Sequence, residues 1–239
     1  MTDITDTLRE RYSKVREEIA ACCRAAGRNE GEINLVVVTK LHSVEEIMAL
    51  LDLGHVKLGE NRAQELVEKY TALQGYDPEP EWHFIGSLQT NKVRQVVGRT
   101  VLIHSVDSLR LARQIANRSK RMELTQEVLL QVNISGEATK SGFAPEDLVT
   151  LWPELLMLEN ISYRGLMTMA PLGASEKEAE KIFTAAAELL KRLRANIADP
   201  NKRRNFTVLS MGMSQDYPVA IRAGATHLRI GTAIMGERG

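Results

Sequence analysis

From residue 33 onward, short apolar runs alternate along the chain with longer stretches that mix apolar and polar residues. The runs are rich in Val, Ile and Leu, and they lie at 33–39, 55–59, 82–86, 100–105, 127–132, 161–167, 206–210 and 227–231. Strands of a parallel sheet that are covered on both faces have this nearly continuous apolar character. The pattern therefore predicts eight parallel strands.

The segments between these runs have the periodicity of amphipathic helices, and several carry start signals. The signals are a capping box at Ser43 and Glu46, a cap at Asp107 or Ser108, and a tolerated first-turn proline, Pro145. Residues 175–198 give a further clear helix. We therefore expect helices between the strands.

Residues 5–27, before the first run, predict one more amphipathic helix. Its apolar positions recur at spacings of four and three. They are Leu8, Tyr12, Val15, Ile19 and Cys22. Gly27 fits the C-terminal end of this helix, which we expect to pack on the main body.

Strands that alternate with helices favour an α/β fold, here a single (β/α)8 TIM barrel with an additional N-terminal helix. The 239 residues agree with the roughly 250 typical of such a barrel, and residues 1–239 are expected to form a single domain. The alternative is a doubly wound open sheet. Its usual GxGxxG fingerprint is absent after the first strand, which runs into Thr39 and Lys40 instead.

Net charge, apolar run length and cysteine content limit which partners and which location are expected. The chain has 31 basic and 31 acidic residues, so net charge gives no reason to expect nucleic acid or a membrane surface as a partner. No apolar run approaches the roughly 20 residues of a membrane span, and the N-terminus is polar, which makes the cytoplasm the expected location. The only cysteines, Cys22 and Cys23, are adjacent; we expect neither a disulfide nor a metal site from them.

Barrel enzymes carry their chemistry at the C-terminal ends of the strands, and Lys40 ends the first predicted strand. Its side chain is expected to point into or over the barrel, where an unpaired ammonium is costly and the neutral amine is favoured. A neutral amine is the nucleophile that forms a Schiff base with an aldehyde. The alternative is a lysine that simply leaves the strand for solvent.

The ends of the last two strands carry small residues suited to a phosphate group. Ser210–Ser214 and Gly231–Thr232 combine hydroxyls with glycines that let backbone N–H groups approach an anion, and barrels often bind phosphate there. Ordinary glycine turns are the alternative. Arg229 lies within the eighth strand and needs an acceptor, for which a pyridine nitrogen and a buried carboxylate are both candidates. His83 and His104 either border a bound ring or are core histidines.

Seven segments of the chain resemble one protein family. They are VVVTK (36–40), GENRAQE (59–65), WHFIGSLQTNK (82–92), HSVDS (104–108), VNISGEATKSGF (132–143), GLMTMAP (165–171) and the long block at 209–238. On these motifs the sequence resembles the YggS/PROSC family of pyridoxal 5′-phosphate (PLP)-binding proteins, also called PLP homeostasis proteins. Arg62 replaces the residue that many members carry after GEN, and the chain ends slightly before the usual tail.

The resemblance implies an alanine-racemase-like barrel and a set of cofactor-binding residues. Lys40 matches the Schiff-base lysine, and Arg229 matches the arginine that faces the pyridine nitrogen. The implied phosphate site comprises Ser210, Ser214, Gly231 and Thr232, with Met211, Gly212 and Met213 lining the same loop. Asn61 and His83 match residues that line the ring. Members are cytoplasmic and often monomeric, and their proposed role is the control of free PLP.

Turnover is not expected from these residues, and no catalytic residue is assigned. Arginine only donates hydrogen bonds, so it favours an unprotonated ring nitrogen and a weak electron sink. Related racemases add a tyrosine base from a second domain, for which this chain offers no obvious substitute. The sequence therefore predicts a protein that holds PLP and delivers or buffers it for apo-enzymes.

Two alternatives remain open: a PLP-dependent racemase or lyase, and a regulator that binds a partner protein according to PLP occupancy. Lys140 is either a second, transit lysine or an ordinary loop residue.

Overall fold

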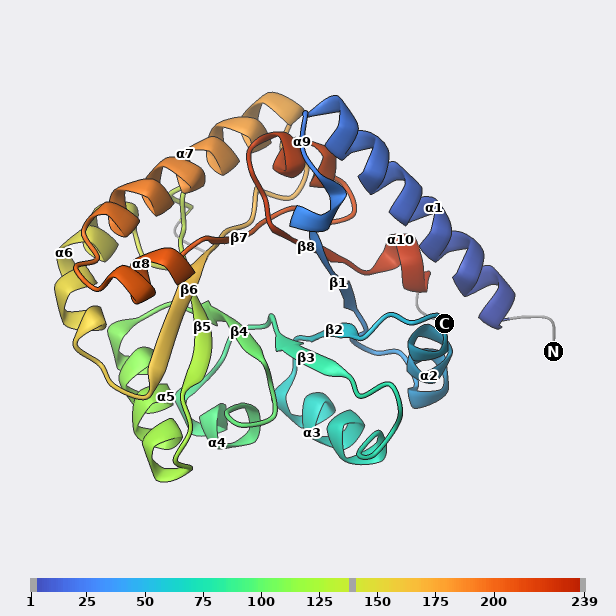
Figure 1. The fold of residues 1–239 in the computed structure, drawn as a ribbon, viewed down its shortest axis with the longest axis horizontal. Coiled ribbons are helices and arrows are strands. Elements are labelled where there is room, and N and C mark those ends of the chain that lie inside the picture. The colour runs from blue at the N-terminus through green and yellow to red at the C-terminus, as the bar shows by residue number, and fades with distance from the viewer. Residues whose placement is uncertain (1–3, 138–140, 237–239) are drawn as a thin grey trace.

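The computed structural model describes residues 4–137 and 141–236, and its strands close into a barrel (Figure 1). Each strand pairs in parallel with the next, and the last pairs with the first. The strands are β1 (Asn34–Val38), β2 (Lys57–Glu60), β3 (Glu81–Phe84), β4 (Leu102–Val106), β5 (Gln126–Gln131), β6 (Ile161–Met167), β7 (Val208–Ser210) and β8 (His227–Ile230). All eight predicted runs are confirmed, with ends that differ by at most two residues. That residues 1–239 form one domain stays a prediction.

Helices form an outer ring around the strands (Figure 1). They are α1 (Ile4–Ala25), α2 (Val44–Asp52), α3 (Ala63–Ala72), α4 (Val93–Val96), α5 (Leu109–Arg121), α6 (Pro145–Leu156), α7 (Glu176–Ala195), α8 (Pro200–Asn205), α9 (Tyr217–Arg222) and α10 (Thr232–Met235). Ser43 and Glu46 make the predicted capping box of α2, and Pro145 occupies the first turn of α6. Of the two candidate caps of α5, Ser108 fills the role and accepts from the Leu111 N–H.

The additional N-terminal helix α1 lies outside the barrel against α2, α9 and α10 (Figure 1). Its buried stripe runs through Leu8, Val15 and Ile19 as predicted, and Tyr12 and Cys22 are half-buried and pack against the same core. The adjacent Cys23, which was not predicted, is also buried, at 1% exposed. Cys23 lies four residues after Ile19, so it continues the same helix face. Both cysteines are free thiols. Within residues 4–137 and 141–236, no helix is long and apolar enough to cross a membrane.

The interior of the barrel differs from the layer around it. Most buried apolar side chains fill the space between strands and helices, whereas a small separate cluster of Leu102, Leu129 and Met167 lies within the barrel. Side chains alternate between the two faces of a strand, so each strand contributes to both layers. The remaining interior positions carry polar groups, which form the candidate site.

Candidate functional site

Lys40 follows β1 directly and is half-buried. Leu35 and Val37 belong to the apolar core between the strands and the helices, whereas the buried Val36 and Val38 do not, so these two face the interior of the barrel. Alternation then directs Lys40 toward the interior and Thr39 toward the helices. Within the described part of the chain, the Lys40 ammonium has no hydrogen bond or ion pair.

Arg229 is a charged residue buried inside the barrel. It lies on β8 opposite Val36 of β1 and is 5% exposed. Its guanidinium donates to Ser210 Oγ and, over 3.1 Å, to the carbonyl of Thr168. Sequence reasoning offered a pyridine nitrogen or a buried carboxylate as the acceptor, whereas the acceptors in the structure are a hydroxyl and a backbone carbonyl. Burial lowers the pKa of Arg229 to about 10, so it stays protonated at neutral pH.

Two histidines extend this network across the barrel. His104 Nδ1 lies 2.8 Å from Ser210 Oγ, and His104 Nε2 lies 2.9 Å from His83 Nδ1. Burial lowers the pKa of His83 to about 3 and lowers that of His104 well below its usual range. Both rings are therefore neutral at pH 7, with one N–H each.

The arginine fixes the direction of these hydrogen bonds. Because Arg229 can only donate, Ser210 Oγ accepts from it and turns its own proton toward His104 Nδ1. His104 then donates from Nε2 to His83, whose remaining proton is on Nε2. If His104 instead donated from Nδ1 to Ser210 Oγ, the Ser210 hydroxyl proton would have no acceptor among the described residues.

Seven buried side-chain atoms have no partner within residues 4–137 and 141–236, and two of them belong to predicted cofactor-binding residues. These two are His83 Nε2 and Asn61 Oδ1. Asn61 follows β2, next to the strand that carries Lys40. Native interiors seldom leave such atoms unpaired, and a bound molecule is one common explanation.

The loops after β7 and β8 provide free backbone donors. In the described chain, the N–H groups of Ser214, Gly231 and Thr232 donate to no carbonyl and no side chain. Met211 and Gly212 are buried beneath the first loop, and Met213 and Ser214 are half-buried above them. Gly212 has φ +95°, and an added Cβ would lie 2.7 Å from Ala220 Cβ. Only glycine lets the chain turn this closely over α9.

The structure brings most of the predicted residues to one sector of the barrel. Asn61, Lys40, Gly231 with Thr232, and Ser214 follow the consecutive strands β2, β1, β8 and β7 at their carboxyl ends. His83, Ser210 and Arg229 lie deeper, inside the barrel. Lys140 lies outside the described residues.

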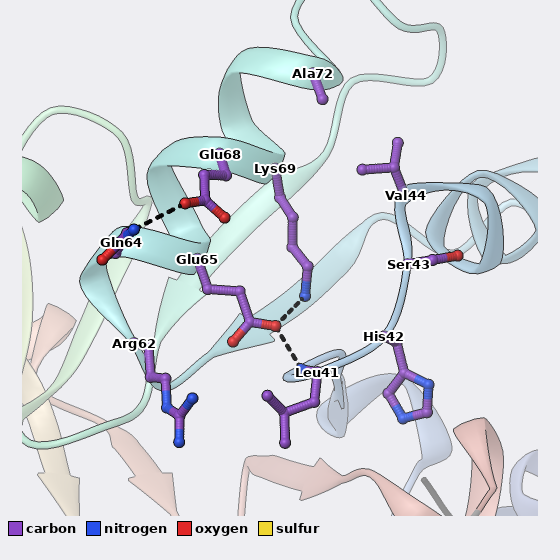
Figure 2. A pocket seen from close by; sticks show the side chains of 10 residues that line it. All are labelled: Leu41, His42, Ser43, Val44, Arg62, Gln64, Glu65, Glu68, Lys69 and Ala72. Atoms are coloured by element: carbon purple, nitrogen blue, oxygen red, sulfur yellow. Dashed lines mark hydrogen bonds and ion pairs between the residues drawn. The ribbon is translucent and has the colours of Figure 1, made fainter. Parts of the chain in front are cut away.

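Sequence reasoning missed three charged residues around Lys40, namely Glu60, Glu65 and Lys69. Glu65 and Lys69 are four residues apart on α3 (Figure 2). Glu60 ends β2. The spacing of Glu65 and Lys69 signals a helical ion pair, but nothing in the sequence shows that Lys69 is buried.

Comparisons with known proteins give consistent results. The sequence profile described as "Alanine racemase, N-terminal domain" matches residues 12–239. The pyridoxal phosphate homeostasis protein of Aquifex aeolicus is 43% identical over 231 residues, covering 96% of this chain and 97% of that protein. The Escherichia coli protein of the same name is 37% identical, covering 100% and 98%.

Solved structures agree with these sequence matches. PipY of Synechococcus elongatus, with PLP bound, is 32% identical with a TM-score of 0.83, covering 98% of this chain and 100% of that one. Alanine racemase of Clostridium difficile is 18% identical with a TM-score of 0.70, covering 96% of this chain and 55% of that one; it shares the barrel fold.

Proposed function

Because this chain belongs to the family of pyridoxal phosphate homeostasis proteins, we propose that it binds PLP at the carboxyl end of its barrel. The observation that carries the proposal is Lys40, a half-buried amine without a partner in the described chain, beside free N–H donors on the neighbouring strands. The PLP found in the related PipY structure supports this ligand.

The residues present fit the chemical parts of PLP. The N–H groups of Ser214, Gly231 and Thr232, with two hydroxyls, offer donors for the phosphate. The loop after β7 that carries Ser214 is lined by Met211, Gly212 and Met213. The unpartnered atoms Asn61 Oδ1 and His83 Nε2 are available to polar groups of the ring. Ser210 is fully buried and already bonded to Arg229 and His104, so we propose that it orients Arg229 and does not contact the phosphate.

Lys40 supplies the covalent link. As the neutral amine, Lys40 would hold the aldehyde carbon of PLP through a C=N bond, with its proton lost to solvent and one water molecule released. The aldehyde is thereby held in a protected form. When bound, PLP supplies an electron sink whose strength depends on protonation of its ring nitrogen.

Arg229 keeps that electron sink weak. A guanidinium donates hydrogen bonds and remains charged at neutral pH, so a ring nitrogen placed against it would stay unprotonated. Its acceptors in the protein are neutral groups, which leaves its charge uncompensated by any hydrogen-bonded carboxylate of the described residues. This setting favours holding the cofactor over carbanion chemistry.

The chain also offers no tyrosine as a second base near Lys40. All five tyrosines are described, and each contacts groups outside the barrel. Their contacts are Tyr12 with His55, Tyr70 with Arg99, Tyr76 with Asp52, Tyr163 with Trp152, and Tyr217 with Glu18. We therefore propose a cytoplasmic, monomeric protein that holds PLP and delivers or buffers it for apo-enzymes. A racemase or lyase is the alternative, and turnover of D- or L-amino acids in steady-state assays would favour it.

The visible absorption spectrum of the protein with added PLP tests the site. Wild type is expected to show a band of bound cofactor that borohydride reduction fixes to the peptide containing Lys40, whereas Lys40→Ala shows no label there. Identical spectra and the same labelled peptide set in both proteins would refute Lys40 as the anchor.

A further inference from the structure

The residue before Lys40 is anchored on the outer side of the barrel wall. Thr39 is fully buried, and its hydroxyl donates to Glu60 Oε1 over 2.6 Å. Its carbonyl accepts a hydrogen bond of 2.7 Å from Lys69 Nζ. Both the side chain and the backbone of Thr39 are thereby tied to charged groups that lie between the barrel and α3.

The residue after Lys40 is anchored as well. Leu41 has φ +63°, a left-handed conformation that is unfavourable for leucine, and its side chain is 49% exposed, so little packing compensates for this cost. Its N–H donates to Glu65 Oε1. A hydrogen bond to a carboxylate is stronger than one to a neutral acceptor, and here it supports the strained turn together with the bond of 3.1 Å from the His42 N–H to the Thr39 carbonyl.

Lys69 joins the two anchors. It is 5% exposed, and its ammonium donates to Glu60 Oε1 and Glu65 Oε1, each over 2.8 Å, in addition to the Thr39 carbonyl. All three of its protons are thus used. Figure 2 shows Glu65 reaching from α3 to both Lys69 and Leu41, at the wall of a hollow of about 780 Å³. We call Glu60, Glu65 and Lys69 the clamp.

The clamp determines where the Lys40 side chain points. Side chains alternate across a strand, so fixing Thr39 toward α3 directs Lys40 into the barrel. The Glu65 bond to Leu41 then stops the chain from rotating after Lys40. We propose that Glu60, Glu65 and Lys69 are positioning residues for the Lys40 amine, an inference that rests on the proposed function only in naming the aldehyde that this amine attacks.

Stability alone does not account for this arrangement. Removing charged groups from water is costly, and well-packed apolar residues often serve as well as a buried ion pair. Burial raises the pKa of Glu60 despite the nearby Lys69, which reflects that cost. The clamp's bonds to the main chain go to the two residues that flank Lys40, which a role in general packing would not require.

The main test compares carboxylates on the same helix. Glu65→Ala removes the acceptor of Leu41, while Glu68→Ala is the matched control because Glu68 bonds only to Gln64 among the described residues. Glu65→Gln keeps an acceptor oxygen at the same reach. We expect Glu65→Ala to slow covalent attachment of PLP on the order of tenfold, the loss expected for one charge-assisted hydrogen bond. Glu65→Gln recovers most of that rate, and Glu68→Ala keeps all of it.

Pyridoxine 5′-phosphate separates positioning from ligand binding, because it has the same ring and phosphate but an alcohol in place of the aldehyde. Its affinity is expected to change less than about twofold in Glu65→Ala, since the phosphate and ring contacts are retained. Thr39→Val, which keeps the shape but not the donor, is the second variant and slows attachment too. The proposal would be overturned if folded Glu65→Ala or Thr39→Val attached PLP at the wild-type rate. It would also be overturned if the affinity for pyridoxine 5′-phosphate fell by the same factor as the attachment rate.

Amide hydrogen exchange tests the clamp without PLP. The Leu41 N–H is expected to exchange on the order of tenfold faster in Glu65→Ala than in wild type or Glu68→Ala. If the wild-type protein does not attach PLP at Lys40, the proposed function fails. The exchange rates still test whether the clamp holds Leu41, because they are measured without PLP. Unchanged exchange at Leu41 would refute the clamp whatever PLP does.

Discussion

Replacing Ser210 with alanine breaks the link between Arg229 and the barrel histidines. Ser210 Oγ accepts from Arg229 and donates to His104 Nδ1, and all three side chains are buried. The substitution leaves His104 Nδ1 without a donor and Arg229 with the Thr168 carbonyl as its one remaining acceptor among the described residues. Water cannot readily replace these partners because His104 and position 210 are both 0% exposed.

The cost follows from these two orphaned groups. A buried polar group left without its partner costs about 1–3 kcal/mol, and a charged one costs more, so Ser210→Ala should lower the free energy of unfolding by about 2–5 kcal/mol. Ser105, the residue after His104 on β4, provides a matched control. It is also 0% exposed, but its hydroxyl has no partner in the described residues, so Ser105→Ala should change stability by less than about 0.5 kcal/mol or increase it.

Urea unfolding measures both variants. Trp82 on β3 and Trp152 on α6 report by fluorescence, and far-UV circular dichroism reports on the helices. Coincident transitions justify a two-state treatment. Equal losses for Ser210→Ala and Ser105→Ala, or no loss in either, would refute the reasoning that Ser210 is a structural partner of Arg229 and His104.

Two further predictions concern pH and backbone conformation. Burial lowers the pKa of four histidines, so the unfolded chain binds more protons than the folded one below about pH 6.5. Stability should therefore fall as the pH drops from 6.5 toward 4, with a slope of at most about 1.4 kcal/mol per pH unit for each histidine. These histidines are His55, His83, His104 and His227. Urea unfolding at several pH values checks this, and constant stability across that range would contradict it. Gly212→Ala should lower the melting temperature more than Gly224→Ala: the two glycines have φ +95° and +96°, but only at Gly212 would the new Cβ meet another atom within 4 Å, so similar losses would show that backbone strain alone decides.

The strands were predictable because both faces of each strand are covered. The Val-rich run before Lys40 is buried at nearly every position of β1, and runs of this kind stand out from amphipathic helices in a single sequence. The same logic placed Lys40 and Gly231 at one end of the barrel, since parallel strands all end on the same side. The N-terminal stripe was right: its five predicted positions pack against the core, and the pattern left out only the adjacent Cys23, which is buried as well.

Side-chain partners were not predictable, because they join distant residues. His104 and Ser210 are 106 positions apart, and no local pattern links them. Arg229 was expected to need an acceptor, but the sequence could not show that a serine and a carbonyl from two other strands would serve. Lys69 looks like a surface lysine in an i,i+4 pair, and only the closing of α3 over β2 buries it.

These partners suggest how one barrel both tolerates and uses buried charge. Among the described residues two cations are buried, and their surroundings differ. Lys69, outside the barrel wall, is matched by two carboxylates, whereas Arg229, inside it, is bonded only to neutral groups of the described chain. A charge that is paired with a counterion stabilises the local geometry, and a charge without a counterion still attracts an acceptor. The paired Lys69 therefore suits the proposed role of positioning Lys40. The Arg229 guanidinium, which has no counterion among the described residues, suits the proposed role of binding a ring nitrogen.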